Sequence, residues 1–234
     1  MSINVIQENA MRIRERIARA KEVGRREEEI TLIGVSKTRP AADIRDAFNA
    51  GVIHFGENRV QEWEAKRGEI AGLSGQWHLI GHLQSNKAAR AARLFHSIDS
   101  VDSIALAERL DRAREESTPT VKLRVLIEVH IGDEETKSGA AISDLPALAE
   151  RMLQLRNLHF AGLMCIPPYL DDIERVRPYF SKLRELRDNL QTQFRHDLPV
   201  LSMGMSHDFE AAIAEGATEV RVGTALFGAR ETTQ

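Results

Sequence analysis

Short runs rich in Val, Ile, Leu and Phe alternate eight times with longer segments that have one apolar face. This alternation restricts the fold more than any other feature, because strands separated by helices pair in parallel and need helical crossovers. Eight such units in one domain close naturally into a barrel. The strand-like runs, of which the fourth is the least pronounced, span residues 30–35, 52–55, 77–80, 96–98, 123–129, 159–164, 200–203 and 219–222.

The segments between these runs are typical of amphipathic helices, since they are rich in Ala, Leu, Glu and Arg. Clear examples are 41–50, 61–70, 104–116 and 145–155. The longest, 179–194, has Phe and Leu at every third or fourth position, and Pro178 suits its first turn. Apolar residues near helical spacing also predict an extra helix before the first strand.

The sequence therefore predicts a single (β/α)8 TIM barrel domain over residues 1–234, a common length for this fold. A doubly wound sheet is the alternative. It would normally have a glycine-rich phosphate-binding turn after the first strand, and the segment from Gly34 to Thr38 matches neither GxGxxG nor GxxxxGK[ST]. No linker rich in Pro, Gly or Ser divides the chain.

Charge and cysteine content exclude several classes of partner and location. The net charge is −3 with both signs interspersed, so no basic field would attract nucleic acid or an anionic membrane. Charges throughout residues 1–20 leave no apolar segment for a signal peptide or a membrane span. Cys165 is the single cysteine and lies in an apolar run, which predicts a buried hydrophobic residue. We expect a cytoplasmic protein.

Polar residues follow the strand-like runs, and in a barrel the carboxyl ends of all strands face one mouth where functional groups collect. Lys37 comes two residues after the first run. A lysine whose stem leaves a packed strand is partly desolvated, and the neutral amine that burial favours can attack an aldehyde. A lysine at a strand end is more often an ordinary solvated side chain, so this position needs support from the rest of the site.

Two later segments supply that support, because they combine glycine with hydroxyl side chains just before predicted helices. These are 202–206, which precedes a helix at 208–214, and 221–224, which precedes another short one. Backbone N–H groups at a helix start attract phosphate, and Ser206 and Thr224 can donate further hydrogen bonds. Barrel phosphate sites often follow strands seven and eight, where both segments are expected.

Motifs along the whole chain, in order, resemble those of the pyridoxal phosphate homeostasis protein family, whose fold is the alanine racemase N-terminal barrel. The motifs are Val35-Ser36-Lys37-Thr38, Phe55-Gly56-Glu57-Asn58, Val60-Gln61-Glu62, His78 to Lys87, Lys137-Ser138-Gly139, Gly162-Leu163-Met164, Leu201 to Ser206 and Val220 to Gly228.

The resemblance implies that Lys37 holds pyridoxal 5′-phosphate (PLP) as a Schiff base. It further implies that Ser206, Gly223 and Thr224 bind the phosphate and that Asn58 approaches the polar edge of the ring. Arg221 would face the pyridine nitrogen, where a permanent positive charge disfavours a proton and makes the ring a weaker electron sink.

The function that this resemblance implies is reversible PLP binding in vitamin B6 homeostasis, which limits free aldehyde and delivers the cofactor to PLP-dependent apoenzymes. The rival is a PLP-dependent amino acid racemase or a Schiff-base aldolase. Alanine racemase takes a second base, a tyrosine, from another domain of the partner subunit. This sequence ends ten residues after Thr224, and its only tyrosines are Tyr169 and Tyr179. We therefore expect a monomer without turnover.

Two further classes are less consistent with the sequence. A metal-dependent hydrolase would use the histidines, but His78 and His82 are four residues apart across a strand end, where that spacing does not place them on one face. We expect an inward-facing His78 and no metal. A protein-interaction module would need no lysine in a pocket. The sequence assigns no role to His82 or Lys137.

Overall fold

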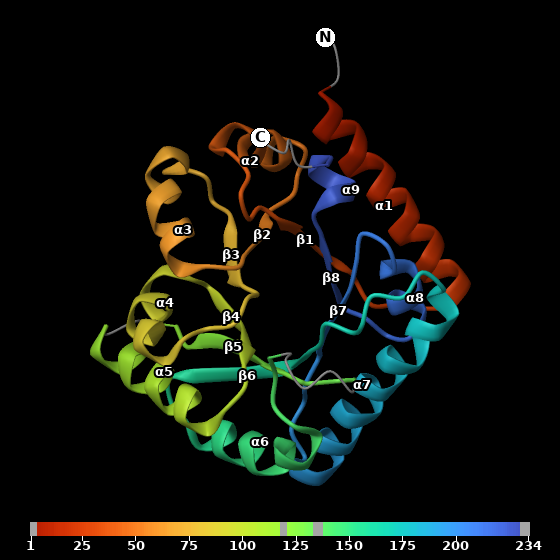
Figure 1. Cartoon of the computed structure of the whole chain (residues 1–234). Coiled ribbons are helices and arrows are strands. Elements are labelled where there is room, and N and C mark those ends of the chain that lie inside the picture. The colour runs from red at the N-terminus through yellow and green to blue at the C-terminus, as the bar shows by residue number, and fades with distance from the viewer. Residues whose placement is uncertain (1–3, 118–120, 133–137, 230–234) are drawn as a thin grey trace.

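A computed structural model describes residues 4–117, 121–132 and 138–229. Its eight strands form a closed parallel barrel in chain order, with the helices packed around the outside (Figure 1). The predicted barrel is thus confirmed. The strands are β1 Thr31–Val35, β2 His54–Glu57, β3 Gln76–Leu79, β4 Ser97–Val101, β5 Leu123–Glu128, β6 Leu158–Met164, β7 Val200–Met205 and β8 Glu219–Val222.

Parallel pairing of β1 with β8 closes the barrel, and Ile33 of β1 is in register with Arg221 of β8. The helices are α1 Val5–Gly24, α2 Ala41–Asn49, α3 Val60–Lys66, α4 Ala88–Leu94, α5 Ile104–Glu116, α6 Leu145–Gln154, α7 Ile173–Phe194, α8 Phe209–Ala214 and α9 Thr224–Phe227. Short 3₁₀ turns lie at η1 Arg67–Ile70, η2 Ser85–Lys87 and η3 Ile142–Asp144. In the described part of the chain, no helix is both long and apolar enough to cross a membrane.

Alternating side chains divide each strand between an apolar layer and the barrel interior. In the outer layer, the rings of Phe55, Trp63 and Trp77 stack between the sheet and α3, with centroids of Trp63 and Trp77 3.8 Å apart. The same alternation places Val35 inside the barrel and sends Ser36, one residue later, towards α3, where it contacts Glu57. Lys37 is therefore again on the inner side, where it lines a cavity at the mouth.

The predicted N-terminal helix is present as α1 and packs outside the barrel against α8 and α9. Its apolar face buries Ala10 and Ile13. The side chain of Asn9 donates a hydrogen bond to the carbonyl oxygen of Leu226 at 3.0 Å, and Arg16 pairs with Glu210 at 2.8 Å. Helix α1 thus supports the two segments that follow β7 and β8.

Several elements differ from the sequence prediction. Strand β2 spans His54–Glu57 and not 52–55, and the helix predicted at 61–70 is divided into α3 and η1. Helix α7 begins at Ile173, so Pro178 lies inside it and not in its first turn. Asp172 explains the earlier start, because its side chain caps the helix by accepting from Glu174 N at 3.0 Å. Strand β4 extends to Val101, beyond the predicted end at residue 98. Its residues Asp99 and Ser100 are fully buried.

Candidate functional site

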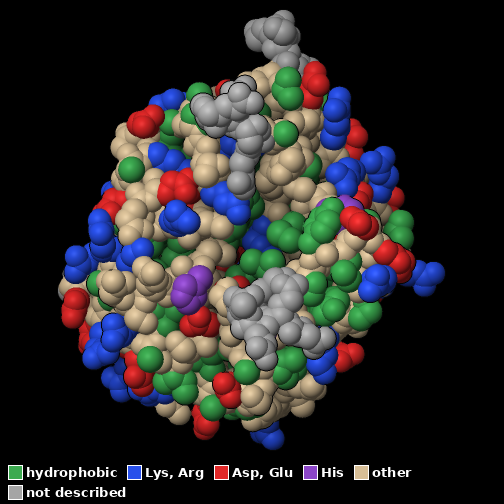
Figure 2. Space-filling model, in the orientation of Figure 1, with side chains coloured by type: hydrophobic (Ala, Val, Ile, Leu, Met, Phe, Trp, Pro, Cys, Tyr) green, Lys and Arg blue, Asp and Glu red, His purple; other side chains and the backbone are tan. Residues whose placement is uncertain are grey.

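A cavity of about 410 Å³ opens at the carboxyl ends of the strands. Figure 2 shows this face of the molecule hollowed at its centre, with Lys and Arg side chains lying in the hollow. Of the six residues predicted to form the site, five line this cavity, and they come from three separate parts of the chain. The lining residues are Val35, Lys37, Arg39, Tyr169, Met205, Ser206, His207, Arg221, Gly223 and Thr224.

Asn58, the sixth predicted residue, lines a neighbouring cleft of about 720 Å³ between the ends of β2 and β3. Its backbone is held by close packing against Gly81, where an added Cβ would lie 2.5 Å from the carbonyl oxygen of Asn58. A glycine is therefore required at position 81. The structure thus places Asn58 beside the cavity that contains Lys37 and not in its wall.

Lys37 lies in a turn directly after β1 and is half-buried. On one side of it, Ser36 is fully buried and its hydroxyl donates to Glu57 Oε1 at 2.5 Å. On the other side, Thr38 has a φ of 61°, and its N–H donates to the carboxylate of Glu62. A β-branched residue rarely adopts this left-handed conformation, so the turn is held by its surroundings.

Lys66 of α3 contacts both Glu57 and Ser36. Its Nζ lies 2.6 Å from Glu57 Oε1 and donates to the carbonyl oxygen of Ser36 at 2.8 Å. Burial raises the pKa of Glu57, although the positive charge of Lys66 and the hydroxyl of Ser36 oppose that effect. The ion pair thus supplies the countercharge that a buried carboxylate needs.

Arg221 of β8 contacts the adjacent β7 and the residue that follows β6, and it is only 2% exposed. It donates to both the carbonyl oxygen and the hydroxyl of Ser202, at 2.7 and 2.8 Å, and to the carbonyl oxygen of Cys165 at 2.7 Å. These acceptors fix a permanent positive charge beside the cavity. Cys165 is fully buried, as predicted, and burial raises the pKa of its thiol to about 12, so it is an uncharged packing residue.

The segments after β7 and β8 meet in the wall of the cavity. Ser206 Oγ accepts a hydrogen bond from Ala225 N, in the first turn of α9, at 3.3 Å. The turn containing Ser206 is fixed by Asp208, whose carboxylate accepts from Met205 N at 2.6 Å. Gly204 has a φ of 90°, and an added Cβ there would lie 2.6 Å from the Cβ of Ala212, so glycine allows α8 to pack closely against this turn. The hydroxyl and glycine pattern therefore converges as predicted.

Sequence reasoning missed five lining residues of this cavity: the apolar Val35 and Met205, and the polar or aromatic Arg39, Tyr169 and His207. The guanidinium of Arg39 donates to the carbonyl oxygen of Gly228. Because Arg39 comes two residues after Lys37 in the same strand-end segment, its position in the sequence could have indicated that it lines the cavity. The rings of Tyr169 and His207 pack at a tilt with centroids 5.3 Å apart, and both residues are exposed. No local pattern predicts that these two rings meet. Lys137 lies outside the described residues.

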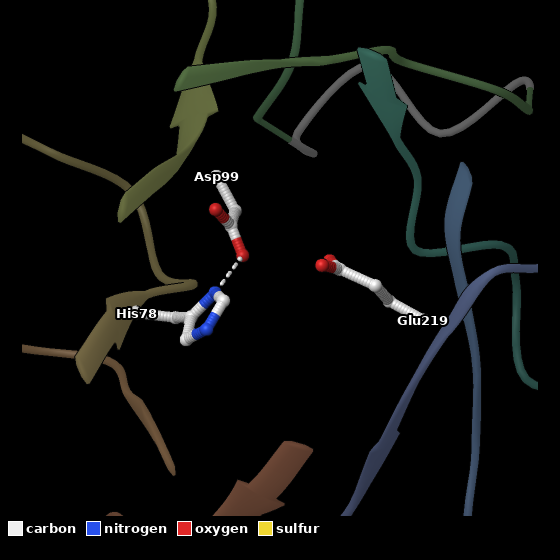
Figure 3. Close-up of side chains that lie close together, drawn as sticks. All are labelled: His78, Asp99 and Glu219. Carbon is white, nitrogen blue, oxygen red and sulfur yellow. Dashed lines mark hydrogen bonds and ion pairs between the residues drawn. The ribbon is translucent and has the colours of Figure 1, made fainter. Parts of the chain in front are cut away.

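A second polar cluster lies inside the barrel. Nδ1 of His54 is 2.9 Å from Nε2 of His78, and Nδ1 of His78 is 3.0 Å from the carboxylate of Asp99. Figure 3 shows His78, Asp99 and Glu219 pointing towards one another from different strands. His78 is therefore the inward-facing residue that the sequence predicts. His82 lies elsewhere, at the mouth, 3.3 Å from Asp102.

The donor atoms of His78, Asp99 and Glu219 lie within 4.8 Å of one another, a spacing that a metal ion could bridge. Arg124, however, already contacts both carboxylates, at 3.5 Å from Asp99 and 2.5 Å from Glu219. It also donates to Ser97 Oγ at 2.9 Å. Although burial alone would raise the pKa of Asp99, the charges of His78 and Arg124 lower it. The geometry is that of an ion-pair network with its own cation.

Comparison with known proteins identifies clear relatives. The family described as "Alanine racemase, N-terminal domain" matches residues 8–231. The pyridoxal phosphate homeostasis protein of Aquifex aeolicus is 48% identical over 225 residues, which cover 96% of this chain and 98% of the relative. The corresponding Escherichia coli protein is 41% identical over 233 residues, covering 98% of each chain.

Solved structures agree with these matches. PipY of Synechococcus elongatus, solved with PLP bound, is 41% identical and superimposes with a TM-score of 0.84 over 95% of this chain and 100% of PipY. Alanine racemase of Clostridium difficile is only 14% identical, with a TM-score of 0.73 over 97% of this chain and 58% of the racemase. That second likeness shows the shared barrel fold alone.

Proposed function

This chain belongs to the pyridoxal phosphate homeostasis protein family, and from that membership we propose that it binds PLP reversibly in the cavity at the barrel mouth. The observation that carries the proposal is the convergence of the Lys37 side chain with Ser206, Gly223 and Thr224 on one cavity. The PLP-bound structure of PipY, a full-length relative, supports the same ligand.

The residues present fit the chemistry of this cofactor. PLP supplies a reactive aldehyde, which condenses with a primary amine to give a Schiff base and one molecule of water. We propose that Lys37 supplies the amine. The hydroxyls of Ser206 and Thr224, with the backbone at Gly223, would bind the phosphate, and a cavity of about 410 Å³ is of the size that holds a cofactor.

Arg221 would face the pyridine nitrogen, and its fixed guanidinium supports that assignment. Because its charge is permanent and its three acceptors hold it in place, it disfavours a proton on a nearby ring nitrogen. Asn58 would approach the polar edge of the ring from the neighbouring cleft. Neither residue would take part in proton transfer.

We propose that the bound cofactor is held without turnover. A racemase needs a second acid or base held on the face opposite the lysine. Tyr169 is the tyrosine that lines the cavity, but it is 72% exposed and the His207 ring that it contacts is exposed as well, so solvent competes for its hydroxyl. The protein would then limit free aldehyde in the cytoplasm and pass PLP to apoenzymes, acting as a monomer.

The test combines binding with turnover. The purified protein is titrated with PLP while the absorbance of the Schiff base is recorded, and the loaded protein is then incubated with L-alanine. We expect one PLP per chain and no accumulation of D-alanine by chiral chromatography. Sustained racemisation that Tyr169→Phe abolishes would establish the enzyme instead, and an unchanged spectrum would contradict PLP binding.

A further inference from the structure

The backbone on both sides of Lys37 is held by side chains from β2 and α3. Ser36 precedes Lys37 and contacts Glu57 and Lys66, while Thr38 follows it and contacts Glu62. None of these side chains lines the cavity that contains Lys37, and Glu62 lines the neighbouring cleft that also contains Asn58. The printed contacts of Glu57, Glu62 and Lys66 are with the backbone and side chain beside the lysine, so they act on its position.

The contacts at Ser36 fix which way Lys37 points. Ser36 donates its hydroxyl to the fully buried Glu57, and its carbonyl oxygen accepts from Lys66 Nζ at 2.8 Å. Because successive side chains of an extended chain alternate between its two sides, a residue 36 held towards α3 turns residue 37 into the barrel mouth. The Lys66 side chain is only 12% exposed, so water competes poorly for these bonds.

The contact at Thr38 fixes the turn in a conformation that it would not otherwise keep. Thr38 has a φ of 61°, and its N–H donates to Glu62. Glu62 Oε1 also lies 3.6 Å from Lys66 Nζ, so the side chains that contact Thr38 and Ser36 form an ion pair with each other. Loss of the Glu62 carboxylate would allow the turn to relax to the backbone conformations that threonine prefers.

We propose that Glu62 and Lys66 are positioning residues, which aim the Lys37 amine into the cavity through the backbone of the Ser36 to Thr38 turn. This inference rests on the proposed function, since it assigns a purpose to the turn only if Lys37 is the reacting amine. It extends the site to the outer side of the barrel wall. The expected consequence is that these residues affect amine chemistry and leave phosphate binding unchanged.

The experiment compares PLP with pyridoxine 5′-phosphate, which keeps the phosphate but has a hydroxymethyl group in place of the aldehyde. We expect Glu62→Ala and Lys66→Met to weaken PLP binding by about fivefold to tenfold, because a misplaced amine condenses less readily. Both variants should bind pyridoxine 5′-phosphate as the unaltered protein does. Glu62→Gln, which keeps an acceptor for Thr38 N, and Lys66→Arg, which keeps the cation, should largely restore PLP binding.

Glu64→Ala is the matched control, since Glu64 is on the same helix but pairs with Arg90 of α4. It should bind both compounds normally. If Glu62→Ala weakens the binding of both compounds equally, or of neither, the positioning role is wrong. The Glu62 side chain is 27% exposed, so Glu62→Ala still tests the role if Lys66→Met fails to fold. If the unaltered protein forms no adduct with PLP but binds pyridoxine 5′-phosphate, the proposed function fails, and the positioning role fails with it.

Discussion

Ser206 is the residue whose removal should separate phosphate binding from amine chemistry. Its hydroxyl lines the cavity that Lys37 also lines and already accepts a hydrogen bond from Ala225 N. A hydrogen bond to a charged group contributes about 1.5–3 kcal/mol, so we expect Ser206→Ala to weaken PLP binding by about tenfold or more. Equilibrium titration with PLP and with pyridoxal, which has no phosphate, measures the effect.

The loss should be confined to PLP, because pyridoxal has no phosphate for Ser206 to bind. Ser143→Ala is the control, since Ser143 is exposed and its hydroxyl donates to the neighbouring Asp144. Equal weakening of PLP and pyridoxal binding in Ser206→Ala would contradict the assignment of this hydroxyl to the phosphate.

Individual residues that line the cavity could be predicted where a local pattern carries the chemistry. Lys37 at a strand end, and Ser206 and Thr224 before helices, follow from the sequence because barrel topology brings strand ends together. Tyr169 could not be predicted, because its place depends on how the segment after β6 folds over the mouth. Asn58 was predicted from resemblance, and the structure places it in the neighbouring cleft.

At the level of elements, the loop after β3 packs against the loop after β2 through Gly81. An added Cβ there would lie 2.5 Å from Asn58 O and 2.8 Å from Asn58 Cα, and both are backbone atoms that cannot rotate away. We expect Gly81→Ala to lower the free energy of unfolding by about 1–3 kcal/mol, the usual cost of overpacking. Urea denaturation followed by tryptophan fluorescence measures the change.

Gly68→Ala provides the comparison, since an added Cβ at this position in η1 meets no atom within 4 Å. Its effect on the free energy of unfolding should stay within about 0.5 kcal/mol, as for most surface substitutions. Similar stability of the two variants would show that the two loops can separate without cost.

The histidine cluster that links β2, β3 and β4 predicts a pH dependence of stability. Burial, together with the charges of His78 and Arg124, lowers the pKa of His54 to about 4. An unfolded histidine titrates near 6.5, so between these values the unfolded chain binds more protons. The stability contributed by neutral His54 is therefore complete above about pH 6.5 and is lost as the pH falls towards 4.

Solvent screening reduces the size of this effect, because His54 is only half-buried. We expect His54 to account for about 1 kcal/mol of the stability lost between pH 7 and pH 5. Urea unfolding at both values should show a smaller loss for His54→Gln than for the unaltered protein, whereas His207→Gln, at an exposed position, should keep the full loss. An identical loss in His54→Gln would refute the assignment.

At the scale of the whole molecule, the barrel was predictable because alternating strand and helix patterns leave few topologies. The pattern failed where tertiary contacts override it. The predicted fourth strand ends at residue 98, but Asp99 is buried in β4, where Arg124 and His78 from other strands compensate its charge. The early start of α7 depends on Asp172, a cap whose signal Pro178 obscured.

The side chains that hold the Lys37 turn also could not be predicted from the sequence. Glu57, Glu62 and Lys66 are ordinary charged residues in sequence, and only the packing of α3 against the ends of β1 and β2 brings them to the Lys37 turn. Strand alternation predicts which way Lys37 points, but not what holds it there. Positioning groups of this kind become visible only when the fold is known.

We propose that one amine at the barrel mouth, that of Lys37, carries the cofactor. Borohydride reduction of the PLP-loaded protein, followed by peptide mapping with mass spectrometry, tests it most directly. We expect one reduced adduct per chain, on the peptide that contains Lys37, in the unaltered protein and in the control Lys87→Ala. Lys37→Ala should give none. An adduct mapped to another lysine, or undiminished trapping in Lys37→Ala, would contradict the account.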